Sequence, residues 1–484
     1  MSLNLIGALD NKNGLGEAAR QMSAVLHTLN LQIAHICDDE LPITKGRNYP
    51  LNLLLASPFD LSQYPSTHLQ SVLAGHYTIS YWFNELTHLP RYWLPLLPHI
   101  NEFWCASHHM QMALQSHAPD AHYLRVPVPI QTYAVPQPIG RQHFGLPQDR
   151  FIVLFSFAAT SSLARKNPFG VIEAFKRAFV DLPANAPAPL LVIRAHRLAE
   201  FPRAAREFRH ALVSVNGILI EQDLSRQYMN DLLGVADVYL SLHRAEGFGM
   251  GMAESMYLGK PVIATGYSAN LDFMNSANSY LVRHDMCKIS EADHELQPEF
   301  GLHYEVGHEW AEPDVAHAAH LLRHVYEHID EAHVKGLQAA HDIRAYCSPD
   351  VVGQIIKERI VALYDDHPTW QRQRLSGFQR QAVMQHDLAP LLVQIEQWQA
   401  RGRELTESLV DIQRQHRQAV DVAQAAATPL GRVRRLLGQA PSAAQQPLPD
   451  PAPLQSELNQ VNAEVIALLT RQLRLAARWL REDV

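Results

Sequence analysis

One stretch decides the fold of this chain and the chemistry it can perform: Ser241-Leu-His-Arg-Ala-Glu246-Gly-Phe-Gly-Met-Gly-Met-Ala-Glu254. An apolar run, Val235 to Leu242, stops at the polar pair that begins with His243. A glycine-rich segment follows, and then a helix-forming run, Met252 to Leu258. This order predicts a strand, a glycine-rich turn and a helix.

The turn combines two kinds of hydrogen-bonding group. Gly247, Gly249 and Gly251 allow backbone amides to approach a ligand without obstruction by a Cβ atom. A helix that begins there points free N–H groups at the same ligand. Glu246 and Glu254 bracket the turn, and their carboxylates can accept hydrogen bonds from hydroxyl groups. Amides for phosphate and carboxylates for hydroxyls together favour a sugar nucleotide.

This pattern also resembles a known group of enzymes. Glu-x7-Glu after a hydrophobic strand, with Gly-Phe-Gly beside the first Glu, resembles the retaining glycosyltransferases of the GT-B type, family 4-like, over roughly residues 1 to 365. The resemblance implies that Glu246 contacts hydroxyls of the transferred sugar and that Glu254 binds the ribose diol. It also implies that the amides of Phe248 to Met250 cap the phosphate or the sugar. The alternative is an ordinary strand–helix turn with two surface glutamates.

A basic pair, Arg165-Lys166, follows the predicted strand Phe151 to Ala158 and precedes the predicted helix Phe169 to Phe179. This placement suits two side chains that grip a diphosphate. Lys166 best matches the Arg/Lys pair of the resembled family, whereas many relatives carry the Arg several residues earlier than Arg165. The alternative is a basic pair facing water, which the helix dipole disfavours. Because the resembled enzymes use cations and amides for the diphosphate, we expect no metal and no other cofactor.

Two further segments are candidates for the donor site. Gly14-Leu-Gly16 follows the first predicted strand and resembles the glycine-rich loop of the N-terminal domain, where Gly16 would allow close backbone approach. It lacks the full Gly-x-Gly-x-x-Gly pattern, which argues against a nicotinamide site. Asn270 follows the predicted strand Pro261 to Thr265, where it either lines the donor site or serves as a plain helix N-cap.

One segment departs from the resembled family. Many relatives carry a His that faces the reacting sugar near the end of an N-terminal strand, where this chain has Ile79-Ser-Tyr-Trp82-Phe-Asn-Glu85. Glu85 could hydrogen-bond the acceptor or the donor, and the alternative is a core Trp82 with a surface Glu85. Together with Trp310-Ala-Glu-Pro-Asp314, the segment resembles a subgroup found in polysaccharide biosynthesis.

Repeated strand–helix units predict an α/β protein with two facing doubly wound Rossmann-like domains, the GT-B arrangement. We expect an N-terminal acceptor domain at 1–145, a nucleotide-sugar donor domain at 146–348, a helix at 349–366 that packs back on the body, and a helical extension at 367–484. The predicted strands are Leu3–Leu9, Leu51–Ala56, Tyr77–Trp82, Glu102–Ser107, Phe151–Ala158, Leu190–Arg194, Gly217–Ile220, Val235–Leu242 and Pro261–Thr265.

Composition excludes several classes of protein. A net charge of −8 argues against a nucleic-acid partner. No signal peptide and no apolar run of about 20 residues is evident. The four cysteines are scattered without metal spacing, which indicates a cytoplasmic protein. One patterned set of histidines shares a predicted helical face and could hold a metal, although a solvated face is the more ordinary reading: His317, His320, His324 and His328.

The C-terminal extension has amphipathic patterning and a proline-rich break from Ala425 to Pro453. Its helices could self-associate as a coiled coil or pack on the body. Four arginines could instead contact anionic lipid at the inner face of the membrane, or remain solvated: Arg471, Arg474, Arg478 and Arg481.

We therefore expect a retaining glycosyltransferase of the hexosyltransferase type. It would move a sugar from a nucleotide-sugar donor to a glycan or lipid-linked acceptor, in the biosynthesis of cell-surface polysaccharide or lipopolysaccharide. Two rivals remain: a nucleotide-sugar 2-epimerase on the same fold, which needs acid/base carboxylates and His around C2, and a non-catalytic scaffold that acts through its C-terminal helices.

Overall fold

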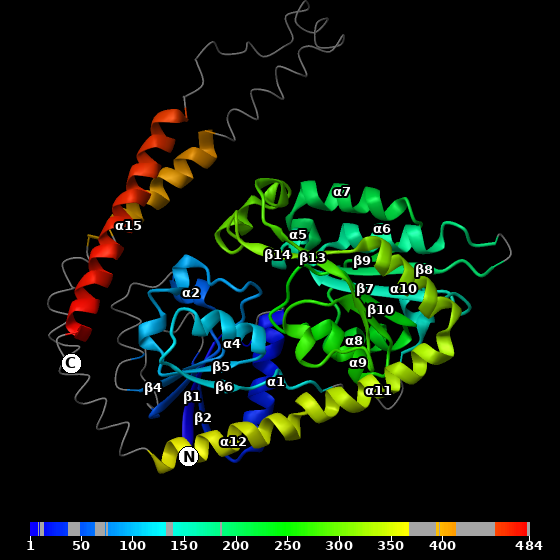
Figure 1. Ribbon diagram of the computed structural model, residues 1–484, viewed down its shortest axis with the longest axis horizontal. Coiled ribbons are helices and arrows are strands. Elements are labelled where there is room, and N and C mark those ends of the chain that lie inside the picture. Colours follow the sequence, from blue (N-terminus) through cyan, green and yellow to red (C-terminus); the bar gives the residue numbers. More distant parts are fainter. Residues whose placement is uncertain are drawn as a thin grey trace, which may run out of the picture. The chain divides into compact units, whose positions relative to one another are not determined.

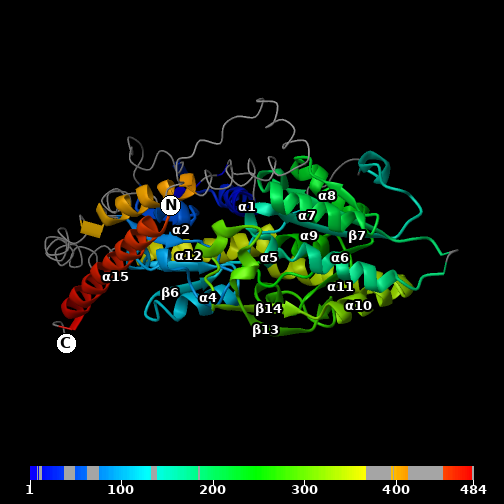
Figure 2. The ribbon, with the colours of Figure 1, turned by 90° about the horizontal axis from the view of Figure 1, so that it is seen from above.

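The computed structural model describes most of the chain: residues 1–7, 9, 14–36, 49–62, 73, 76–131, 139–183, 186–366, 394–395, 397–412 and 451–481. Contacts divide the chain into two compact units, Met1–His367 and Pro368–Val484. The first unit holds two α/β domains that lie side by side, blue to cyan and green in Figure 1 and seen from above in Figure 2.

The first domain is built on a six-stranded parallel sheet in the order β2-β1-β3-β4-β5-β6. Its middle strands are buried at almost every position, as expected for a parallel sheet covered by helices on both faces. The strands are β1 (Ser2–Ile6), β2 (Gln32–Ile36), β3 (Leu51–Leu54), β4 (Tyr77–Ser80), β5 (Glu102–Cys105) and β6 (His122–Arg125), and the helices are α1 (Gly14–Thr28), α2 (Pro58–Ser62) and α4 (His108–Gln115).

The second domain has a six-stranded parallel sheet in the order β12-β11-β10-β7-β8-β9, so the strand order reverses between β7 and β10. Ligands of such sheets bind outside the carboxyl ends of the strands at this reversal. The strands are β7 (Ile152–Ala158), β8 (Leu190–His196), β9 (Ile218–Ile220), β10 (Val238–Ser241), β11 (Val262–Thr265) and β12 (Tyr280–Val282). The helices are α5 (Leu163–Lys166), α6 (Pro168–Phe179), α7 (Pro202–Val213), α8 (Arg226–Val235) and α9 (Met250–Tyr257).

Three long helices complete the first unit after a two-stranded hairpin of β13 (His284–Lys288) and β14 (Glu309–Pro313). Helices α10 (Val315–Glu327) and α11 (Ile329–Cys347) belong to the second domain, and α12 (Pro349–Asp365) returns to the first (Figure 1). Tyr364 donates a hydrogen bond to the carbonyl oxygen of Ser2 at 2.6 Å, and Arg359 pairs with the buried Glu102 at 2.6 Å. These contacts attach the end of α12 to the first sheet.

The predicted fold class, two doubly wound α/β domains with C-terminal helices, is confirmed, and most predicted strands exist with shifted ends. The two six-stranded sheets contain three short edge strands that the sequence did not predict: β2 and β6 in the first sheet and β12 in the second. The predicted strand from Val235 begins only at Val238, because Val235 is the last residue of α8.

The second unit pairs two helices. Helix α15 (Ala452–Arg481) contacts the helical segment 397–412 through the buried side chains of Leu405, Leu409 and Val461. A Cβ atom on Gly402 would lie 3.4 Å from Val461, and Arg401 pairs with Glu457 at 2.7 Å. The proline-rich break from residue 425 to residue 450 and the side chains of the four C-terminal arginines lie outside the described residues. The predicted break ends too late, because α15 already begins at Ala452 and includes Pro453 in its first turn, where proline is tolerated. In the part of the chain that the structure describes, no helix is long and apolar enough to cross a membrane.

Candidate functional site

Two loops meet at the reversal of the second sheet. Arg165 and Lys166 follow β7 and precede the long helix α6, as predicted, and they form the end of the short helix α5. The Ser162 side chain accepts a hydrogen bond from the Arg165 amide at 3.3 Å, and Asn167, in the left-handed region at φ 51°, ends α5 and caps α6. Glu246 follows the neighbouring strand β10. The reversal of strand order between β7 and β10 therefore brings the predicted basic pair next to the predicted carboxylate.

The basic pair and Glu246 form a compact ion cluster. Lys166 Nζ donates to Glu246 Oε1, and Arg165 Nη1 lies 3.4 Å from Glu246 Oε2. The same Arg165 nitrogen donates to the Ala245 carbonyl oxygen at 2.7 Å. Arg165 is only 2% exposed, whereas Lys166 keeps a partly accessible side chain. The predicted alternative of a basic pair facing water does not describe Arg165.

Burial and pairing set the charges of this cluster. Burial alone would raise the pKa of Glu246, but Lys166 and Arg165 lower it to about 2. Burial lowers the pKa of Lys166 below its usual value, although Glu246 opposes this. Glu246 is therefore ionised at neutral pH and can accept hydrogen bonds from hydroxyl groups, but it holds no proton to donate.

The first domain contributes Glu85 to the same cluster. Glu85 Oε1 lies 3.3 Å from Arg165 Nη2, and its Oε2 accepts a hydrogen bond from Tyr304 at 3.3 Å. The Arg165 guanidinium also lies 5.8 Å from the centre of the Tyr304 ring. Glu85 is therefore a partner of the basic pair across the two domains. Trp82 is a core residue that packs edge-to-face on Trp93 and Phe103.

The glycine-rich turn has the geometry that the sequence predicts. Gly249 has φ 98° and caps α9, and a Cβ atom there would lie 2.5 Å from Met252 Cε. A Cβ atom on Gly251 would lie 2.4 Å from the Tyr239 hydroxyl oxygen. Gly247 approaches the first domain, where its carbonyl oxygen accepts a hydrogen bond from Ser107 Oγ at 3.0 Å. Helix α9 begins at Met250, so the amides of Met250 and Gly251 have no partner within the helix, whereas the Met252 amide donates to the Gly249 carbonyl oxygen at 3.1 Å. Phe248 is buried against Phe273.

Glu254 lies in α9 and is 3% exposed. Its Oε1 forms an ion pair with Arg226 Nη2 at 2.6 Å, and Arg226 Nε lies 3.2 Å from Glu17 Oε1 of the first domain. Burial raises the pKa of Glu254, although Arg226 opposes this. Arg226 was not predicted as a site residue. The sequence does contain a signal for Arg226, because it is a cation in the first turn of a helix, where positive charge opposes the helix dipole. The same signal supported the basic pair.

Asn270 is fully buried next to the turn. Its Nδ2 donates to the Thr265 carbonyl oxygen at 3.0 Å, and its Oδ1 lies 3.1 Å from His243 Nε2. It is the second residue of a 3-10 turn that Ser268 begins, so it is not the predicted N-cap. Burial lowers the pKa of His243 to about 4, and the ring is neutral at neutral pH. Asn270 therefore stabilises the structure beside the glycine-rich turn through these hydrogen bonds.

The remaining candidates lie apart from this cluster. Gly14 and Gly16 open α1, with Gly14 exposed and Gly16 buried directly before Glu17. His317 Nδ1 accepts a hydrogen bond from the Arg283 amide at 3.0 Å, and His324 stacks on His328 with ring centres 4.4 Å apart. Across the described ranges no group of three His, Cys, Asp or Glu side chains is placed to hold a metal ion.

No protein-family model matches the chain, and no curated protein sequence matches it. Solved structures do. HepE of Anabaena in complex with UDP-glucose superposes with a TM-score of 0.54 at 13% identity, over 75% of this chain and 100% of that one. A sucrose-phosphate synthase of Thermosynechococcus elongatus gives 0.56 at 13% identity, over 75% and 99%. A glycosyltransferase of Rickettsia africae gives 0.51 at 12% identity, over 74% and 98%. The chain therefore has the two-domain GT-B fold of these proteins.

Proposed function

We propose that the protein is a retaining glycosyltransferase that moves a sugar from a nucleotide-sugar donor to a glycan or lipid-linked hydroxyl acceptor. One observation carries the proposal: the strand reversal of the second sheet brings Lys166 and Arg165 to Glu246, beside a glycine turn that opens a helix. In this transfer the bond from the sugar to the diphosphate breaks, and a bond from the sugar to the acceptor oxygen forms. The bonding electrons leave with the diphosphate, and the proton of the acceptor hydroxyl passes to the leaving diphosphate oxygen.

The residues of the ion cluster can bind both the diphosphate and the sugar of the donor. Lys166 and the first-turn amides of α9 are placed to neutralise a departing diphosphate. Because the pKa of Glu246 is about 2, its carboxylate can accept hydrogen bonds from sugar hydroxyls throughout the neutral range. Lys166 and Glu246 pair with each other. A bound donor would give each a new partner, phosphate for the lysine and hydroxyls for the glutamate.

Glu254 completes the donor site in this proposal. It is buried in α9 and held by Arg226. A carboxylate held in this way can accept two hydrogen bonds from the diol of a ribose. The bound UDP-glucose in the HepE structure supports a nucleotide sugar as the ligand class of this fold.

The rival functions have less support. An epimerase needs a histidine or carboxylate free to exchange a proton at C2, but His243 is fully buried and bonded within the protein. A non-catalytic scaffold would not require the buried ion pairs of Lys166 with Glu246 and of Arg226 with Glu254. We place the reaction in polysaccharide or lipopolysaccharide biosynthesis, on the resemblance of the segments that contain Glu85 and Trp310.

Isothermal titration calorimetry with a panel of nucleoside diphosphates, UDP first, tests the site. Lys166→Ala should weaken binding about ten- to a hundredfold, the effect of losing a charge-assisted hydrogen bond. Glu254→Ala should weaken the binding of nucleoside diphosphates but not that of inorganic pyrophosphate, which has no ribose. Lys176→Ala, an exposed lysine on α6, is the matched control and should bind as the wild type does. Unchanged affinity in both Lys166→Ala and Glu254→Ala would refute the donor site.

A further inference from the structure

Three aromatic side chains gather where the two domains meet, beside the ion cluster. Phe59 lies in α2, and Tyr92 lies in the 3-10 turn Arg91–Trp93, which contacts α2. His303 comes from the loop between β13 and β14 of the second domain. The Tyr92 ring meets the rings of Phe59 and His303 nearly edge-to-face, with ring centres 5.9 and 5.4 Å apart. Together Phe59, Tyr92 and His303 form what we call the aromatic platform.

The topology of the first sheet places the platform at a position that suits a ligand. In the order β2-β1-β3-β4-β5-β6, the strand order reverses between β1 and β3. Helix α2, which carries Phe59, follows the carboxyl end of β3, and Tyr92 belongs to the connection that leaves β4. Ligands of open α/β sheets bind outside the carboxyl ends of the strands, beside such a reversal. The first domain therefore has its own candidate binding position, and the platform lies there.

The platform is continuous with the ion cluster. Tyr304, next to His303 in the chain, donates a hydrogen bond to Glu85 at 3.3 Å. Glu85 lies 3.3 Å from Arg165, which lies 3.4 Å from Glu246. Burial lowers the pKa of His303, and the charges of Glu85 and Arg165 also act on this ring. A ligand on the platform would therefore lie on the Glu85 side of Arg165, with the sugar of the donor on the Glu246 side.

The platform is accessible from solvent. Phe59 is 42% exposed, and Leu302, next to His303 in the chain, is 69% exposed. Tyr92 and His303 are half-buried, and the Tyr92 hydroxyl oxygen lies 2.6 Å from His303 Nδ1, so the two rings hold each other in place. The C–H groups on one face of a sugar ring carry partial positive charge, which the negative face of an aromatic ring attracts. Aromatic side chains beside a carboxylate therefore suit a sugar.

The charges around the platform favour an uncharged ligand. Asp60 and Glu85 both raise the pKa of His303, but burial outweighs them, so the ring is neutral at neutral pH. Arg165 is already paired with two carboxylates, Glu85 and Glu246. An anionic ring would meet Asp60 and Glu85 without a cation to offset them. The Glu85 side chain is about a quarter exposed and can accept a hydrogen bond from a hydroxyl group.

We propose that the aromatic platform is the acceptor subsite, where a neutral sugar ring packs on Phe59 and Tyr92 while Glu85 accepts a hydrogen bond from one of its hydroxyls. The inference rests on the proposed glycosyltransferase function and names the class of its acceptor, a neutral saccharide. Glu85 positions the ring through a hydroxyl next to the reacting one. The reacting hydroxyl keeps its own proton for the leaving diphosphate oxygen.

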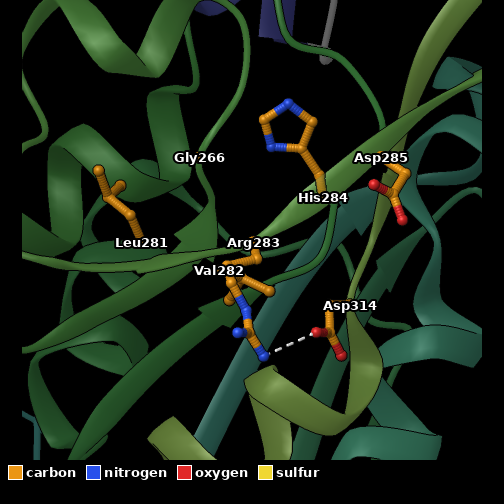
Figure 3. A pocket seen from close by; sticks show the side chains of 7 residues that line it. All are labelled: Gly266, Leu281, Val282, Arg283, His284, Asp285 and Asp314. Atoms are coloured by element: carbon orange, nitrogen blue, oxygen red, sulfur yellow. Dashed lines mark hydrogen bonds and ion pairs between the residues drawn. The ribbon is translucent and has the colours of Figure 1, made fainter.

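A hollow of about 530 Å³ in the second domain provides a contrast, and Figure 3 shows Arg283 paired with Asp314 at its edge. All of its lining residues belong to the second domain, and the segment 266–268 lies between it and Glu246. Substitutions in this hollow therefore serve as controls for the platform.

Saturation-transfer NMR with methyl glycosides of glucose, galactose, mannose and N-acetylglucosamine tests the proposal on the full-length protein. At least one glycoside should bind the wild type. Phe59→Ala should weaken that binding about tenfold, because it removes an aromatic face, whereas Phe59→Trp should retain it. Val334→Ala, which removes an exposed apolar side chain of α11, and Arg283→Gln in the hollow are the controls. Both should bind as the wild type does.

Octyl glucoside distinguishes a sugar site from a lipid contact. Saturation of the sugar-ring protons is expected, whereas saturation of the octyl chain alone would overturn the proposal. A wild type that binds none of the glycosides, or that binds them no better than Phe59→Ala does, would also overturn it.

Calorimetry with UDP on the same proteins separates this inference from the donor-site proposal, which depends on Lys166. If a glycoside binds through Phe59 while no nucleoside diphosphate binds the wild type, the platform is a sugar site and the proposed function fails. If nucleoside diphosphate binds and the glycosides do not, only the acceptor inference fails.

Discussion

Replacing Glu246 by glutamine should destabilise the protein in a manner that depends on pH. The carboxylate is buried between Lys166 and Arg165, and its pKa falls from the usual 4.5 to about 2. This fall corresponds to about 3 kcal/mol of stability at neutral pH. Because the folded pKa is the lower one, the contribution is complete above about pH 4.5 and disappears as the pH falls through 2. At pH 3 about half of it, roughly 1.5 kcal/mol, should remain.

Urea unfolding followed by tryptophan fluorescence measures this difference at pH 7 and at pH 3. Glu246→Gln leaves Lys166 buried without a counter-charge, so the loss at pH 7 should be at least as large as the linkage value. Glu173→Gln is the matched control: Glu173 pairs with Arg177 at 2.6 Å on the exposed face of α6, and such pairs contribute less than about 1 kcal/mol. A Glu246→Gln penalty that stays constant from pH 7 to pH 3, or that is no larger than the control's, would refute the reasoning.

Two further predictions concern the reaction and the C-terminal unit. Excess EDTA should leave turnover of the nucleotide sugar intact, because Lys166 and Arg165 supply the positive charge at the diphosphate. Loss of turnover with EDTA and its recovery with Mn²⁺ or Mg²⁺ would contradict this. A chain that ends at His367 should still bind nucleoside diphosphate but form a smaller oligomer in light scattering, or bind liposomes more weakly, than the full chain. An insoluble truncation, or one that cannot bind nucleotide, would mean that the second unit is part of the folded core.

The local part of the site could be predicted because it depends on residues close together in the chain. Gly249 needs a left-handed backbone, and Gly251 must lie against Tyr239, so a strand followed by a glycine-rich helix start has a strong sequence pattern. The basic pair could be found for a similar reason, since cations near a helix N-terminus are unfavourable without a purpose. The glycine-rich turn and the two glutamates beside it were therefore evident from spacing.

The non-local partners could not be predicted. Arg165 meets Glu85 and Tyr304 from distant parts of the chain, and Arg226 joins Glu254 to Glu17. No periodicity in the sequence encodes which helix start faces which strand end. Edge strands such as β2, which is exposed or half-buried at every position, lack a strong apolar pattern because an edge position tolerates polar residues. β12 is apolar but only three residues long, too short for a recognisable pattern.

The sequence by itself determined the alternation of strands and helices, the glycine turn and the chemical character of its two glutamates, because these follow from local backbone geometry and side-chain type. The tertiary structure alone decided the charges. Lys166 and Glu246 are 80 residues apart in the chain. Burial lowers the pKa of Lys166, whereas the two neighbouring cations lower the pKa of Glu246 against the effect of its burial. Such shifts arise from desolvation and from short distances between opposite charges. Both are set only when the reversal of strand order between β7 and β10 brings the two loops together.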